Sequence, residues 1–75
     1  MLGVMDQSTK APLYEIRVRG VLGDTLLSAF PALRGRADDG STVLRGCLPD
    51  QAALHGVLGQ IESLGLELLA VRRVG

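Results

Sequence analysis

Few residues in this chain have side chains that could do chemistry, and the sequence contains only one histidine and one cysteine. His55 could act as a general base or contact an anion, but no second residue is placed to work with it, so we favour a hydrogen-bonded histidine at the edge of the core. Cys47 lies shortly before a predicted helix, whose N-terminus can activate a thiol. A Cys47–His55 nucleophile pair would still lack an orienting group and an oxyanion site, so no catalytic residue is expected and Cys47 is interpreted as an inert thiol.

Arginines are the stronger candidates for binding, because guanidinium groups hold carboxylates and phosphates through paired hydrogen bonds. Four of them are expected on one face of a sheet and are the candidate ligand-binding residues, together with His55: Arg17, Arg19, Arg45 and Arg72. The simpler alternative is cross-strand pairing with Glu15 and Glu67, or plain solvation, and we favour it. No metal or other cofactor is expected, since one histidine and one cysteine cannot form a zinc site by themselves.

Six elements must position these residues, and the first four extend up to Cys47. Residues 13–19 alternate between apolar and charged side chains with a period of two, which predicts a half-buried strand. Asp24 is a good N-cap for a short helix that ends around Pro31. Residues 33–37 and 42–47 predict two strands, joined by the tight hairpin turn that an Asp-Gly dipeptide favours.

The second helix is the clearest element of the sequence. Asp50 is expected to cap its N-terminus, and apolar residues recur along it at helical spacing. These residues are Leu54, Val57, Leu58, Ile61 and Leu64. Gly65 then supplies the left-handed conformation that ends the helix, and Leu66 is placed to cover the helix end in a Schellman arrangement. The last strand is expected over residues 68–74.

The order strand, helix, strand, strand, helix, strand predicts a ferredoxin-like split β-α-β fold of the α+β class. Two right-handed crossover units joined by a hairpin give a four-stranded antiparallel sheet in the spatial order fourth, first, third, second. Both helices are expected on one face of this sheet. We expect a single ferredoxin-like domain over residues 13–75, after a flexible N-terminal tail over residues 1–12.

The other face of the sheet has no cover in a single copy. We expect Leu44 to point toward the helices, because burying Arg45 would be costly, and this facing leaves apolar residues on the uncovered face. Val43, Leu68 and Ala70 are therefore the predicted interface residues, although a solvated face with ordinary charges is the alternative. Residues 34–36 protect the edge of the second strand against pairing with another chain. Residues 68–71 carry no charge, so the last strand is the better edge for pairing in a dimer.

Length and composition favour self-association. A chain of 75 residues buries only about 60% of its unfolded surface, and a single cysteine excludes an internal disulfide as reinforcement. We therefore expect a homo-oligomer, most simply a dimer. The formal net charge of zero and the 3% of aromatic residues argue against nucleic-acid binding. Neither a signal peptide nor a membrane span is expected, so the chain is placed in the cytoplasm without a membrane partner.

Four segments carry a resemblance to known proteins: residues 14–18, residues 64–66, residues 68–71 and, most specifically, Asp50-Gln51-Ala52-Ala53-Leu54-His55-Gly56. Together they resemble a group of short uncharacterised proteins of actinobacterial type, over residues 13–74. The resemblance implies a small stand-alone domain with no established activity. The architecture is also similar to that of ACT-type regulatory modules, which bind small molecules at subunit interfaces, but no motif supports more than this analogy.

The sequence leaves two main hypotheses about function, with a protein–protein adaptor as a third class. The first is a small non-catalytic binding or interaction module that acts as a homodimer. The alternative is a small-molecule-binding regulatory sensor of ACT-like type, or a small enzyme that uses His55, with a small-molecule ligand as the partner.

Overall fold

A computed structural model describes residues 12–74 of the chain, so residues 1–11 of the expected tail lie outside the described part. The elements occur in the predicted order. They are β1 (Leu13–Arg19), α2 (Asp24–Leu27), β2 (Arg34–Asp38), β3 (Ser41–Cys47), α3 (Gln51–Ser63) and β4 (Leu68–Arg73). Pro12 already belongs to the fold, because its carbonyl oxygen accepts a hydrogen bond of 3.0 Å from the amide of Leu48.

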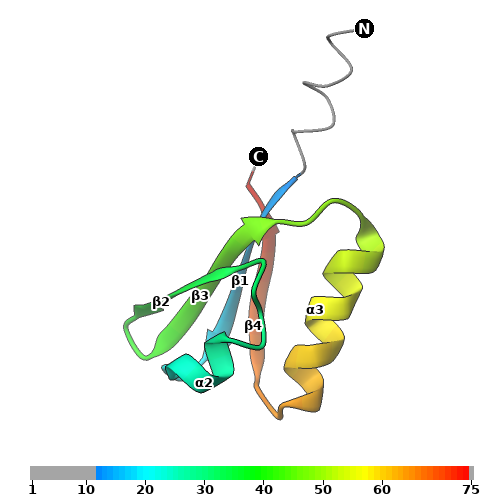
Figure 1. Cartoon of the computed structure of the whole chain (residues 1–75). Coiled ribbons are helices and arrows are strands. Elements are labelled where there is room, and N and C mark those ends of the chain that lie inside the picture. The colour runs from blue at the N-terminus through cyan, green and yellow to red at the C-terminus, as the bar shows by residue number, and fades with distance from the viewer. Residues whose placement is uncertain (1–11, 75) are drawn as a thin grey trace, which may run out of the picture.

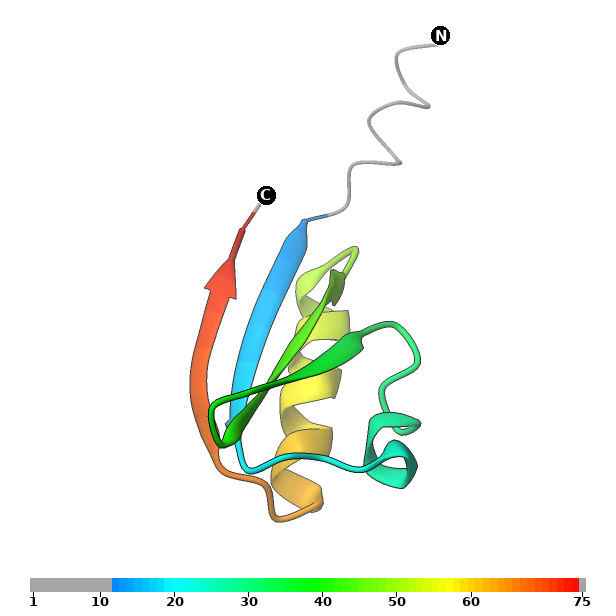
Figure 2. The same ribbon diagram turned by 90° about the vertical axis from the view of Figure 1, so that its left-hand side faces the viewer.

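The four strands form one antiparallel sheet in the order β2-β3-β1-β4. This order and the two intervening helices confirm the ferredoxin-like α+β fold (Figure 1). Both helical segments pack against one core on the same side of the sheet (Figure 2). We call the opposite side, which carries Glu15, Arg17 and Arg19 of β1, the open face.

The alternation of β1 determines which side chains enter the core. Ile16 and Val18 are completely buried against the helices, while their charged neighbours point to the open face. Leu44 of β3 lies opposite Ile16 and is also completely buried, which confirms its predicted inward facing. The hairpin between β2 and β3 turns at Asp39 and Gly40, whose φ values of 53° and 83° are those of a type I′ turn.

The first helix is a single turn and begins differently from the prediction. Gly23 is its N-cap and Asp24 its first helical residue, and no side chain caps this end. The extended conformation of Gly23 lets its carbonyl oxygen accept the first helical hydrogen bond, from Leu27 at 3.0 Å, so the cap lies one residue earlier than expected. Phe30, only 2% exposed, then anchors the following segment in the core.

Helix α3 begins and ends as the sequence predicts. The carboxylate of Asp50 accepts a hydrogen bond of 2.8 Å from the amide of Ala53. At the other end Gly65 has a φ of 74°, and the amides of Gly65 and Leu66 donate to Glu62 and Ile61, which is the Schellman pattern. Leu64 does not join the buried stripe as expected: it is the C-cap residue and is 41% exposed.

Strand β4 contains an irregularity that changes one prediction. Its register with β1 pairs Leu68 with Val18 but Ala70 with Arg17, so Leu69 is an extra residue at a β-bulge. Because Val18 faces the helices, Leu68 also lies on the helix side of the sheet. The expectation that Leu68 shares the open face with Ala70 and Arg72 is therefore wrong, since the bulge interrupts the alternation on which it rested.

Candidate functional site

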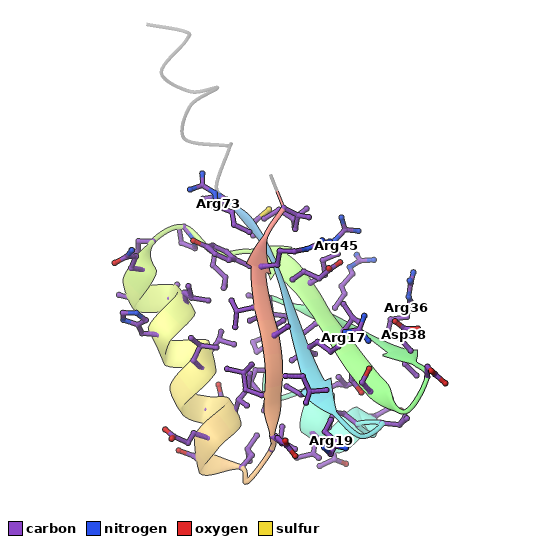
Figure 3. The ribbon with its side chains drawn as sticks, turned by 180° about the vertical axis from the view of Figure 1, so that it is seen from behind. Arg17, Arg19, Arg36, Asp38, Arg45 and Arg73 are labelled. Atoms are coloured by element: carbon purple, nitrogen blue, oxygen red, sulfur yellow. The ribbon has the colours of Figure 1, made fainter. Side chains whose placement is uncertain are left out.

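The open face is built from charged rows that run across the sheet. One row contains Arg34, Arg45, Glu15 and Arg72, one from each strand. The next row contains Arg36, Val43, Arg17 and Ala70 in the same strand order. Figure 3 shows the side chains of Arg17, Arg36 and Arg45 on the side of the sheet away from α3. The four arginines predicted to share one face therefore lie on it, and the structure adds Arg34 and Arg36.

Carboxylates pair with all four of the predicted arginines. Arg72 donates to Glu15 at 3.0 Å, and Arg45 lies 3.7 Å from the other oxygen of the same carboxylate. Arg19 donates to Glu67 at 2.7 Å. These contacts are the cross-strand pairing that the sequence analysis favoured over a ligand site.

Arg17 has a partner that the sequence analysis did not name. Its guanidinium donates to Asp38 at 3.0 Å and to the hydroxyl of Ser41 at 2.7 Å, reaching across β3 to the end of β2. Ser41 in turn donates to the backbone oxygen of Asp38 at 2.8 Å. Arg17 is thus held by the β2–β3 hairpin, and it separates Val43 from Ala70 in the row that they share.

The remaining two arginines of this face have a different environment. No carboxylate of residues 12–74 forms an ion pair with Arg34 or Arg36. Both line a groove of about 610 Å³ over β2, β3 and β1, which we call the arginine groove. Its lining includes Glu15, Arg34, Arg36, Val43, Arg45 and Cys47. The sequence analysis used residues 34–36 only as an edge feature, although the Arg-Gly-Arg alternation places both guanidiniums on one face.

His55 and Cys47 do not form a common site. His55 is exposed on α3 and lines a separate hollow of about 470 Å³ on the helix side, together with Glu62, Leu66 and Leu68. Cys47 is exposed at the end of β3 and lines the arginine groove on the open face. The sheet therefore separates His55 from the arginines, and within residues 12–74 no group of three or more His, Cys, Asp or Glu side chains could hold a metal ion.

The edge strand β4 is the most exposed element of the sheet. All six of its residues are exposed, including Leu68 at 43%, Leu69 at 41% and Val71 at 39%. Leu64, at the end of α3, adds a fourth large apolar side chain that is exposed by 41%. Of the predicted interface residues, Val43 and Ala70 lie on the open face, and Leu68 lies on the helix side of this edge.

The comparisons with known proteins identify a family but no activity. A family model described as "Domain of unknown function (DUF8691)" matches residues 13–72. No curated protein and no solved structure matches the chain. Neither helix of the described residues has the length and apolar character that crossing a membrane requires.

Proposed function

The chain belongs to the DUF8691 family, a domain of unknown function, and we propose that its domain is a non-catalytic binding module that acts as a homodimer paired through β4. The observation that carries this proposal is the exposure of a whole edge strand with an apolar centre. Natural edge strands are usually shortened, charged or covered against pairing with another chain. Residues 68–71 carry no charge and lie at the uncovered edge of the sheet in a single copy, and the bulge at Leu69 is the one irregularity within them.

The backbone of β4 is available for a further strand. The amide of Val74 donates to Leu13 of β1 at 2.7 Å, and successive amides of a strand point in opposite directions. The amides of Arg72 and Ala70 then also point toward β1, and the amide of Val71 points away from the sheet. A second copy would satisfy this outer edge with main-chain hydrogen bonds and continue the sheet across the dimer.

The sequence of β4 is complementary to itself. Its first residue comes directly after the acidic Glu67, and its last two residues are Arg72 and Arg73. Antiparallel pairing about a twofold axis at Ala70 places Leu69 opposite Val71 of the second copy and brings the acidic end of each strand to the basic end of the other. A twofold interface needs this kind of self-matching surface.

Stacking of two open faces explains the molecule less well. Among residues 12–74, six arginines lie on that face against three carboxylates, which are Glu15, Asp38 and Glu67. Stacking would bring the excess positive charge of one open face against the same excess on the other, so the two copies would repel each other. In addition, Arg17 divides the apolar patch that the stacking would need. Edge pairing through β4 avoids both penalties, because the open faces stay in solvent.

Two further points complete the proposal. The exposed free thiol of Cys47 is typical of a reducing compartment, so we place the dimer in the cytoplasm. For the alternative, a sensor or enzyme that uses His55, the hollow beside His55 offers mainly apolar side chains and one carboxylate, without the arginines. We therefore prefer the non-catalytic module.

The test is the molar mass of the full chain, measured by size-exclusion chromatography with light scattering at tens of micromolar. We expect twice the mass of one chain. Leu69→Lys places a charge at the centre of the edge, as natural edge strands do, and is expected to give the mass of one chain. Val21→Lys is the matched control, because Val21 is 65% exposed, lies outside β4 and undergoes the same change of chemistry.

A monomeric wild type at these concentrations would overturn the proposal. A Leu69→Lys variant that stays dimeric would also overturn it, because the dimer would then form through another surface. The Val21→Lys control should remain dimeric, and its dissociation alongside Leu69→Lys would show a general effect of charge rather than an edge interface.

A further inference from the structure

We propose that the arginine groove binds a small organic anion, with Arg34, Arg36 and Arg45 holding its carboxylate or phosphate oxygens. This site is separate from the β4 edge, so the inference does not depend on the dimer. The site shares only Arg45 with the four arginines singled out by sequence. It adds Arg34 and Arg36, the two guanidiniums that no described carboxylate pairs with.

The first argument is a charge conflict built into the register. Arg34 lies directly opposite Arg45 on the neighbouring strand, and like charges in this position destabilise a sheet. The nearest compensation is Glu15, which lies 3.7 Å from Arg45 but binds Arg72 more closely, at 3.0 Å. A bound anion between the guanidiniums would remove the conflict, and local conflicts of this kind occur where a sequence serves function.

The second argument is the shape and lining of the groove. Its volume of about 610 Å³ is within the range of small-molecule sites. Leu13, Ala32 and Val43 give it an apolar part beside the three arginines. The ligand therefore combines an anionic group with a short apolar body. None of the described residues that line the groove is aromatic, so they offer no stacking surface of the kind by which proteins hold single-stranded nucleic acid.

The third argument is that the groove wall is fixed before a ligand arrives. A Cβ atom at Gly46 would collide with the carbonyl oxygen of Ala32, so this glycine lets the segment before β2 lie directly against β3. The amide of Leu33 also donates to Phe30 at 3.0 Å, and Phe30 is anchored in the core. The start of β2, and with it Arg34, is thereby held over β3, which reduces the ordering that binding would require.

The experiment is an NMR titration of the full chain, in separate arms with butyrate and with butyl phosphate at constant ionic strength. We expect saturable shifts at millimolar concentrations in the amides of residues 34–36 and 45–47, and the arm with the tighter binding identifies the preferred oxyanion. Cys47, the only cysteine of the chain, gives a second readout: its reaction with a thiol reagent should slow when the groove is occupied.

Variants distinguish specific binding in the groove from nonspecific electrostatic attraction of the anion. Arg34→Gln and Arg36→Gln should each weaken binding about tenfold, the loss of one charged hydrogen-bonding group. Glu15→Gln should strengthen binding, because Glu15 is the one carboxylate in the described lining of the groove. Tighter binding by a variant cannot result from unfolding. Arg19→Gln is the control, since Arg19 lies on the same face and its replacement changes the net charge equally.

Three outcomes would overturn the proposal. One is the absence of saturable shifts in both arms. Another is equal weakening by Arg19→Gln and Arg34→Gln, which would reduce the binding to general charge attraction. The third is weaker binding in Glu15→Gln than in the wild type, because the groove would then not be the place where the anion lies.

Discussion

At the scale of single residues, the open face is organised by which arginines have a carboxylate within reach. Glu15 serves both Arg45 and Arg72, and Asp38 crosses a strand to reach Arg17. Alternation along β1 was enough to predict that arginines gather on this face. It could not predict which of them are neutralised, because that depends on the register between strands that are distant in sequence. Arg34 and Arg36 were missed for another reason: they were interpreted only as protection of the edge strand, although their alternation and the hairpin turn place them on the same face as Arg45.

The opposed pair Arg34 and Arg45 leads to a prediction about stability. Arg34→Gln should raise the free energy of unfolding by about 0.2–1 kcal/mol, because it removes a like-charge cross-strand pair. Arg36→Gln is the matched comparison, since Arg36 lies opposite Val43 and should change stability less. Urea denaturation at low and at high salt measures the effect, which should shrink as salt screens the charges. Destabilisation by Arg34→Gln would show that the guanidinium supports the fold rather than a ligand.

At the scale of elements, the parts predicted best are those whose ends have local signals. Asp50 and Gly65 mark the two ends of α3, and both act as expected. The bulge in β4 has no comparable signal, because an extra leucine in a run of apolar residues looks like ordinary alternation. The cap of α2 was misplaced by one residue for a similar reason: Gly23 and Asp24 are both acceptable N-cap residues, and only the backbone conformation distinguishes them.

Two glycines, one inside α3 and one just after it, are expected to have opposite effects on stability when each is replaced by alanine. Gly56 lies inside the helix with open space around its Cα, so Gly56→Ala should stabilise the protein by about 0.5–1 kcal/mol through helix propensity and chain entropy. Gly65→Ala should destabilise it by a similar amount or more, because φ is 74° there. Chemical denaturation of the two variants checks both signs. Equal effects of the two changes would contradict the assigned end of the helix.

At the scale of the whole molecule, the high apolar content of the chain is divided between a small core and an uncovered edge. Eight apolar residues of the described part are buried, while Leu68, Leu69 and Val71 of β4 stay exposed. The order of the strands and the single layer of helices were predicted from the order of elements, because few topologies connect them without crossing. The uncharged edge at residues 68–71 was also predicted from the sequence, but the exposure of Leu69 and Val71 there was not, since it depends on how far α3 covers the edge of the sheet.

This division predicts that thermal stability depends on protein concentration. If two copies pair through β4, dilution favours the unfolded monomers, and Tm should fall by about 3–6 °C for each tenfold dilution. Leu69→Lys should remove this dependence, and its Tm should match the dilute limit of the wild type. Calorimetry or circular dichroism melts across two decades of concentration would measure both. A wild-type Tm that does not change with concentration would mean that the core alone sets the stability and that the exposed β4 edge contributes nothing to it through a second copy.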